Sequence, residues 1–262
     1  MLIHNPQGHY QFLKGIDPYS CGVIADSGFE IVQVSLTTPM DWRSGFDCIG
    51  RYLDEIGEGK SSLCAVQLRC PAPYSMEGFI AFNQGYCQVL QDWGLFVHGI
   101  NPVARTNVAP ADKPPADPNL FSFFHTSRIS QPNRAPSFVV AGAGELLEGK
   151  LDARGIVRRG ETSGPALHEK ATYVAKVMNE RLLGLGAKPD AAIQINIYTI
   201  HPLDVLLSEC ILPAFPLAAQ AGIHWYPSQP PVREIEFEMD VVGVRRKLWM
   251  EPTRAVAESR AS

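Results

Sequence analysis

The chain has no long basic run and no apolar run long enough to span a bilayer, in 262 residues with a formal net charge of −4. Nucleic acids and anionic membranes attract proteins through clustered lysine and arginine, so neither is expected as the main partner. The first residues also lack the charged segment followed by an apolar one that is typical of a secretory signal. We therefore expect a cytoplasmic protein whose partner is a small molecule or another protein.

Several motifs that carry familiar chemistry are also absent. The sequence has no CxxC pair, no cysteine and histidine cluster at zinc spacing, no HExxH and no GxSxG. Five of its six cysteines precede residue 90, which is too uneven for a disulfide framework, so they are expected to be small buried hydrophobes. Gly142, Gly144 and Gly149 do not have the spacing of a dinucleotide loop. We expect neither a metal nor an organic cofactor.

The order of predicted elements is the same in the two halves of the chain. Each half reads strand, helix, strand, helix, strand, strand, and a proline-containing segment at 130–136 is the predicted boundary. We therefore divide the chain into domains at 1–130 and 131–262. In the first half, strands are predicted at 28–36, 63–70 and 120–129, and the residues 95–97 are predicted to end a further buried strand. Helices are predicted at 41–57 and 76–93. In the second half, strands are predicted at 137–143, 192–199, 223–226 and 234–244, with helices at 167–184 and 204–220.

One arginine, Arg105, follows the predicted strand end at 95–97 among small and apolar neighbours. A guanidinium keeps its charge at any working pH and presents a planar fork of donors, so its natural complement in an apolar cleft is a carboxylate. That carboxylate belongs either to a ligand or to the protein itself, in a structural ion pair.

Three glutamates alternate along the last predicted strand. Glu234, Glu236 and Glu238 would share one face of it, because side chains alternate with a period of two. Such a row is either the solvated face of a sheet or the lining of a cleft. In a cleft, apolar surroundings would raise a carboxyl pKa toward the range of a general acid or base.

Three separated segments of the first half resemble the RidA/YjgF/UK114 superfamily. DPYS at 17–20 resembles the family's GPYS element, Asn83 resembles the asparagine of its second helix, and ARTNV at 104–108 resembles its arginine segment. The resemblance implies two tandem α+β domains, each a mixed β-sheet with two helices on one face. It also implies a homotrimer assembled through the other sheet faces.

The resemblance also implies roles for particular residues. Arg105 would hold a substrate carboxylate, Tyr19 would orient the ligand or a water, and Asn83 would support the site, with Asn107 and His125 also placed at the substrate. The family's acid is missing around His125, where the first half has FSFFH. Glu236 or Glu238 of the second half resembles that acid, so a complete site would need both halves.

Three functions remain open at this point. The first is a hydrolytic enzyme that deaminates an imine or enamine of a small carboxylated metabolite and releases ammonia. The second is cleavage of a cyclic carboxylate, as in the chorismatases, whose two-domain arrangement this chain resembles. The third is a carboxylate-binding module without catalysis.

Overall fold

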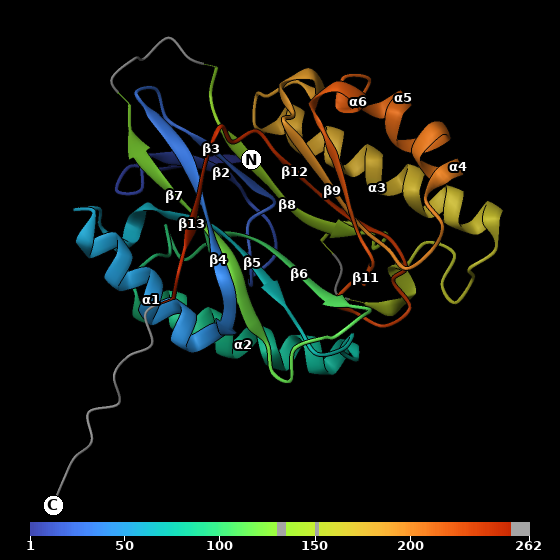
Figure 1. Cartoon of the computed structure of the whole chain (residues 1–262), viewed down its shortest axis with the longest axis horizontal. Helices are drawn as coiled ribbons and strands as arrows, with labels where there is room; N and C mark the ends of the chain where they lie inside the picture. The colour runs from blue at the N-terminus through green and yellow to red at the C-terminus, as the bar shows by residue number, and fades with distance from the viewer. Residues whose placement is uncertain (130–134, 150–151, 253–262) are drawn as a thin grey trace, which may run out of the picture.

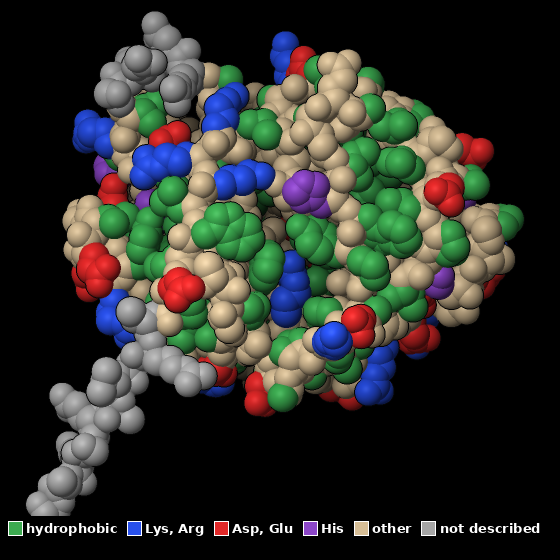
Figure 2. All heavy atoms as spheres, in the orientation of Figure 1, with side chains coloured by type: hydrophobic (Ala, Val, Ile, Leu, Met, Phe, Trp, Pro, Cys, Tyr) green, Lys and Arg blue, Asp and Glu red, His purple; other side chains and the backbone are tan. Residues whose placement is uncertain are grey.

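Two mixed β-sheets lie face to face at the centre of the molecule, and helices cover the outer face of each (Figure 1). The computed structural model describes residues 1–129, 135–149 and 152–252. No helix in these ranges is both long and apolar enough to cross a membrane. On the face drawn in Figure 2, acidic and basic side chains are scattered among apolar ones.

The first sheet carries the two helices predicted for the first half. Helices α1 (Trp42–Glu55) and α2 (Met76–Asp92) cover its outer face, and Asp41 caps α1 by accepting a hydrogen bond from the Ser44 N–H at 3.0 Å. The strands, in their order across the sheet, are β11 (Ser228–Gln229), β6 (Ala104–Pro110), β5 (Leu63–Arg69), β7 (Asn119–Arg128), β4 (Phe29–Asp41) and β13 (Arg246–Met250).

The second sheet is covered by α3 (Gly164–Gly184), α4 (Asp204–Leu206), α5 (Leu212–Ala214) and α6 (Ala218–Ala221). The single helix predicted at 204–220 is correct only in part, since the chain is helical over 204–214 and 218–221 but leaves helical backbone at Phe215, where Pro216 disfavours it. A π-helical turn at Leu207–Ile211 joins α4 to α5. The strands, in order, are β1 (Leu2–Asn5), β2 (Tyr10–Leu13), β3 (Gly22–Ala25), β8 (Phe138–Gly144), β12 (Glu238–Val242), β9 (Gln194–Tyr198) and β10 (Ile223–Tyr226).

The repeated order of elements corresponds to a repeated pattern of strand pairing. In the first sheet β4 pairs with β7 and β7 with β5, both antiparallel, and β5 pairs with β6 in parallel. In the second sheet β8, β12, β9 and β10 pair in the same order and the same directions. Two mixed sheets are therefore built on one pattern.

The ends of the chain cross between the sheets. The first three strands join the second sheet through β3 and β8, whereas β13 joins the first sheet through β4. The predicted boundary at 130–136 lies mostly outside the described residues, and the division into domains at 1–130 and 131–262 stays a prediction.

The inner faces of the two sheets form an apolar core of their own. This core includes Tyr10, Phe12, Val23, Ile31, Phe124, Val139 and Val242. The expectation that these helix-free faces join separate chains is wrong, because each already covers the other within one chain. The homotrimer itself stays a prediction.

Candidate functional site

A cavity of about 360 Å³ takes its lining from both sheets. Arg105 and Asn107 come from β6 of the first sheet, whereas Glu238 comes from β12 of the second. Tyr19 also lines it, from the turn before β3. The structure therefore brings together residues that are more than a hundred positions apart in the sequence.

Arg105 lies within β6 and not after a strand end, since 95–97 forms no strand. Its guanidinium carbon lies 4.8 Å from the ring centre of Tyr19 and 4.6 Å from that of Tyr86. Its Nη2 donates to Oδ1 of Asn83 at 2.7 Å. Aromatic rings and one amide thus hold a 3% exposed cation without neutralising it.

Hydrogen-bonding capacity is left over around this arginine. Within the described chain, Nη1 of Arg105 and both polar side-chain atoms of Asn107 are buried without a hydrogen-bond partner. Buried polar groups are nearly always paired, so unpaired ones on two residues that line a cavity point to a ligand. One carboxylate oxygen and one further polar group of a ligand would satisfy these atoms.

Tyr19 is held in place by a turn that is fastened to the start of β6. Asn101 donates from its side chain to the Pro18 carbonyl at 2.8 Å, and the Ser20 hydroxyl donates to the Pro102 carbonyl at 2.9 Å. Burial raises the pKa of Tyr19 to about 12, although Arg105 lowers it. The side chain therefore remains a neutral phenol that can donate a hydrogen bond near Arg105.

Glu238 is the acid that the structure places in the cavity. It is 4% exposed, and burial raises the pKa of its carboxyl well above the ordinary value, with Asp240 adding to the rise. Gly142 makes room for it, because a Cβ at Gly142 would overlap Oε1 of Glu238. A carboxyl that keeps its proton beside a ligand-facing arginine can serve as a general acid.

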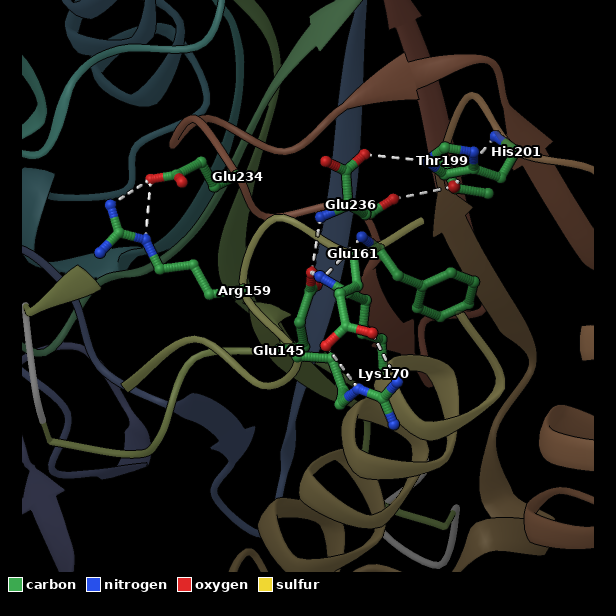
Figure 3. Close-up of polar contacts among 10 residues, drawn as sticks. Glu145, Arg159, Glu161, Lys170, Thr199, His201, Glu234 and Glu236 are labelled. Carbon is green, nitrogen blue, oxygen red and sulfur yellow. Dashed lines mark hydrogen bonds and ion pairs between the residues drawn. The ribbon is translucent and has the colours of Figure 1, made fainter. Parts of the chain in front are cut away.

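Glu234 and Glu236 do not line the cavity. Glu234 has a φ of +72° and forms an exposed ion pair with Arg159 at 2.7 Å (Figure 3). The Glu236 carboxylate accepts a hydrogen bond from Nε2 of His201 at 2.8 Å. The prediction that these residues share a strand face with Glu238 is wrong, because β12 begins only at Glu238.

The backbone before β12 is diverted by a buried carboxylate. Glu145 accepts the N–H groups of Glu236 at 2.7 Å and Phe237 at 3.0 Å, and its charge is paired with Lys170 at 2.9 Å (Figure 3). These backbone groups would otherwise be free to form strand hydrogen bonds. Lys170 and Glu145 are both fully buried.

The other two predicted binding residues differ in position. Asn83 contacts Arg105 and lines a neighbouring cavity of about 670 Å³. His125 is not at either cavity, because it lies on the α1 side of β7, with its ring centre 5.5 Å from that of Tyr52. Burial lowers the pKa of His125 to about 4.

Sequence reasoning missed two cavity residues, Arg181 and Glu148. Arg181 is buried in α3 and pairs with Glu148 at 2.5 Å. The signal in the sequence was its spacing, since Arg181 is three residues after Met178 and seven after Val174, on the apolar stripe of the predicted helix. A basic residue on such a stripe needs a buried partner.

In the described part of the chain, no three His, Cys, Asp or Glu side chains are grouped so that they could hold a metal ion. The cavity instead offers cationic, phenolic, amide and carboxyl groups. A cavity lined by a buried arginine and a buried acid of raised pKa has the kinds of group with which an enzyme can bind a carboxylate and transfer protons.

Comparison with known proteins identifies the family. The model of the family described as 2-aminomuconate deaminase CnbZ matches residues 2–248, and the chain belongs to this family. A 2-amino-5-chloromuconate deaminase of Comamonas testosteroni is 34% identical over 247 residues, which cover 94% of this chain and 97% of the relative. The protein is therefore a deaminase that acts on a small carboxylated metabolite.

Solved structures show weaker similarity. A chorismatase is 10% identical, with 85% of this chain and 77% of that chain covered and a TM-score of 0.47. A cyanuric acid hydrolase from A. caulinodans is 11% identical, with 86% and 69% covered and a TM-score of 0.40. Both TM-scores are too low to carry an inference about chemistry. The resemblance to the RidA/YjgF/UK114 superfamily stays a prediction.

Proposed function

We propose that this protein hydrolyses a 2-amino derivative of muconate, an enamine with a carboxylate at each end, to ammonia and the corresponding 2-oxo acid. The observation that carries the proposal is the unpaired donor of Arg105 in the same cavity as the buried Glu238 carboxyl. The names of the family and of the relative supply the substrate class.

Arg105 would bind the carboxylate attached to the amino-bearing carbon. Its free Nη1 and the Asn107 amide would bond the carboxylate and a neighbouring polar group, whereas Asn83 keeps the guanidinium in place. The Tyr19 ring, beside the guanidinium, limits where a flat conjugated substrate can lie. These contacts hold the amino-bearing carbon close to the acid.

The reaction would begin with protonation of the substrate carbon chain. The Glu238 carboxyl gives its proton to a carbon conjugated with the amino group, and the enamine becomes an iminium ion. Glu238 is then a carboxylate and takes a proton from a water molecule while the water oxygen bonds to the iminium carbon. This step gives a carbinolamine and restores the Glu238 carboxyl.

Loss of ammonia completes the reaction. The hydroxyl proton of the carbinolamine moves to nitrogen through Glu238, the carbon–nitrogen bond breaks, and a carbonyl forms. One water is consumed and one ammonia is released, and no electrons are exchanged with a cofactor. A single carboxyl of raised pKa serves each step, because it alternates between acid and base.

The test is ammonia release from 2-aminomuconate by the wild type and by Arg105→Lys. Lysine keeps the charge but loses the planar fork, so kcat/KM should fall by about 10- to 100-fold, the effect of losing a charged hydrogen bond. The matched control is Arg43→Lys, an exposed residue of α1, which should behave as the wild type. Release no faster than the spontaneous rate, or equal activity of Arg105→Lys, would refute the proposal.

A further inference from the structure

A second arginine, Arg181, lines the cavity, and two of its nitrogen atoms already donate hydrogen bonds within the protein. Nη1 of Arg181 donates to the carbonyls of Ala141 at 2.9 Å and Gly142 at 3.4 Å, and Nη2 donates to Oε1 of Glu148 at 2.5 Å. Its Nε is buried and has no hydrogen-bond partner among the residues that the structure describes. Backbone carbonyls thus fix the guanidinium, and Glu148 is the carboxylate that pairs with it among the residues that the structure describes.

The partner of Arg181 is much less buried than Arg181 itself. The Glu148 side chain is 46% exposed, against 8% for Arg181, and both residues line the cavity. The thiol of Cys21, at 3.8 Å, is a weak additional donor to Glu148. Glu148 regains contact with water when it leaves Arg181, and an incoming carboxylate keeps the buried guanidinium paired, so the exchange has a modest cost.

Arg181 and Arg105 enter the cavity from different layers of the molecule. Arg105 comes from β6, and Arg181 comes from α3, which covers the other sheet. The charges of both arginines act on Tyr19 and on Glu238. The groups proposed for catalysis are therefore within electrostatic reach of two cations.

We infer that Arg181 binds the second carboxylate of a dicarboxylate substrate, and that Glu148 occupies this position until the substrate displaces it. The inference rests on the proposed function for the position of the first carboxylate at Arg105. It makes Arg181 the residue that selects dicarboxylates over monocarboxylates. In the alternative, Arg181 and Glu148 form a structural ion pair that no ligand replaces.

A matched pair of unreactive ligands separates these alternatives. Muconate has the carbon chain and both carboxylates but no amino group, and sorbate is the same diene with one carboxylate. Calorimetric titration would give the affinity of each for the wild type, using the cis,cis and trans,trans isomers of muconate. We expect the better muconate isomer to bind about 10-fold or more tightly than sorbate.

Two variants test the residues. Arg181→Lys should weaken muconate binding and leave sorbate binding nearly unchanged. Glu148→Gln removes the competing carboxylate, so muconate affinity should rise by more than sorbate affinity. Because Glu148 is half exposed, this variant should fold even if Arg181→Lys does not. Glu161→Gln, which makes the same charge change at an exposed ion pair outside the cavity, should alter neither affinity.

The outcomes also separate this inference from the proposed function. Equal affinity of the wild type for muconate and sorbate, or no gain in Glu148→Gln, would overturn the role of Arg181. Ammonia release from 2-aminomuconate alongside that result would leave the deaminase proposal intact. A strong muconate preference without ammonia release would instead support the dicarboxylate site and refute the proposed reaction.

Discussion

Two neighbouring acids of β12 share one buried region but have different surroundings. Asp240 accepts hydrogen bonds from Gln67 at 3.2 Å, Thr106 at 2.8 Å, Tyr198 at 2.9 Å and Asn196 at 2.6 Å. Burial raises the pKa of Asp240, and these four donors act against that rise, whereas burial and the charge of Asp240 raise the pKa of Glu238 well above its ordinary value. Of the two acids, the one that faces the cavity therefore has its acid form favoured more strongly.

The raised pKa of Glu238 predicts how activity depends on pH. Because the pKa of Glu238 is raised, its acid form is present at low pH and is lost as pH rises through that pKa, so kcat/KM should fall on the alkaline side. Asp240→Asn removes a charge that raises this pKa and should move the fall to lower pH. Steady-state kinetics across the pH range would measure both.

Glu238→Gln should lower kcat/KM by about 10²- to 10⁴-fold, the usual contribution of a general acid or base. Glu234→Gln, at an exposed ion pair, is the control for removing one acid. An unchanged alkaline limb in both Glu238→Gln and Asp240→Asn would show that another group titrates.

The burial of His125 predicts that pH affects stability through this residue but does not affect catalysis through it. Its pKa is lowered to about 4 by burial, so its contribution to stability is full above the unfolded value of 6.5 and is lost as pH falls toward 4. Between about pH 7.5 and about pH 5, the wild type should lose about 2 kcal/mol more unfolding free energy than His125→Phe. Urea unfolding would measure this difference, and an altered KM of His125→Phe would contradict its position away from the cavity.

At the scale of single residues, the sequence predicted the positions that a local motif marks. The segments around Tyr19, Asn83 and Arg105 can be read without coordinates, and the structure places these residues in contact or on one cavity. Arg181 and Glu148 carry no such motif. They meet only because α3 packs on the sheet that contains β8, which periodicity alone does not reveal.

Among the elements, the segment that leads into β12 decides where Glu238 points. Glu145 binds the two backbone N–H groups that precede Glu238, and the fully buried Lys170 balances its charge. A buried pair of this kind is costly to break, because the remaining partner becomes an unpaired charge in an apolar setting. The pair therefore acts as a positioning device for Glu238.

Lys170→Met should lower the unfolding free energy by about 3–5 kcal/mol, the cost of leaving one buried partner unpaired. In the fraction that remains folded, kcat should fall more than KM changes, because the Glu238 carboxyl is displaced. Denaturant unfolding and steady-state kinetics measure these effects. The matched control is Arg159→Met, which breaks an exposed ion pair to the same segment and should change little (Figure 3).

Equal effects of Lys170→Met and Arg159→Met would contradict this role. So would a Lys170→Met enzyme that is destabilised but keeps its kcat, since the pair would then serve only the fold.

Elements with a strong local period were predictable, and elements set by distant contacts were not. The helices at Trp42–Glu55, Met76–Asp92 and Gly164–Gly184 agree with the predicted ones, since each has a regular apolar face. Residues 234–237 alternate like a strand, but a carboxylate some ninety positions earlier takes two of their hydrogen bonds. Strand β13 was missed because it lies at a sheet edge, where its side chains are mostly exposed.

For the whole molecule, the two halves depend on each other in three ways. Their inner sheet faces share one apolar core, the strands at the two ends of the chain cross between sheets, and the cavity takes Arg105 from one half and Glu238 from the other. The repeated order predicted from the sequence is visible in the strand pairing, but this crossing of strands could not be predicted, because short terminal strands fit either sheet edge equally well.

The last prediction follows from that dependence and uses fragments 1–130 and 131–262. Each should be inactive alone, since 1–130 lacks Glu238 and leaves β1 to β3 without β8, and 131–262 lacks Arg105. Co-expressed, the two fragments should associate through the inner faces and regain ammonia release, and Glu238→Gln in the second fragment should lower that release by the same factor as in the intact chain. If either fragment alone released ammonia at the wild-type rate, a complete site would exist within one half and the shared cavity would not be the active site. Analytical ultracentrifugation would establish whether the restored activity belongs to a one-to-one pair, the composition that two mutually covering sheets require.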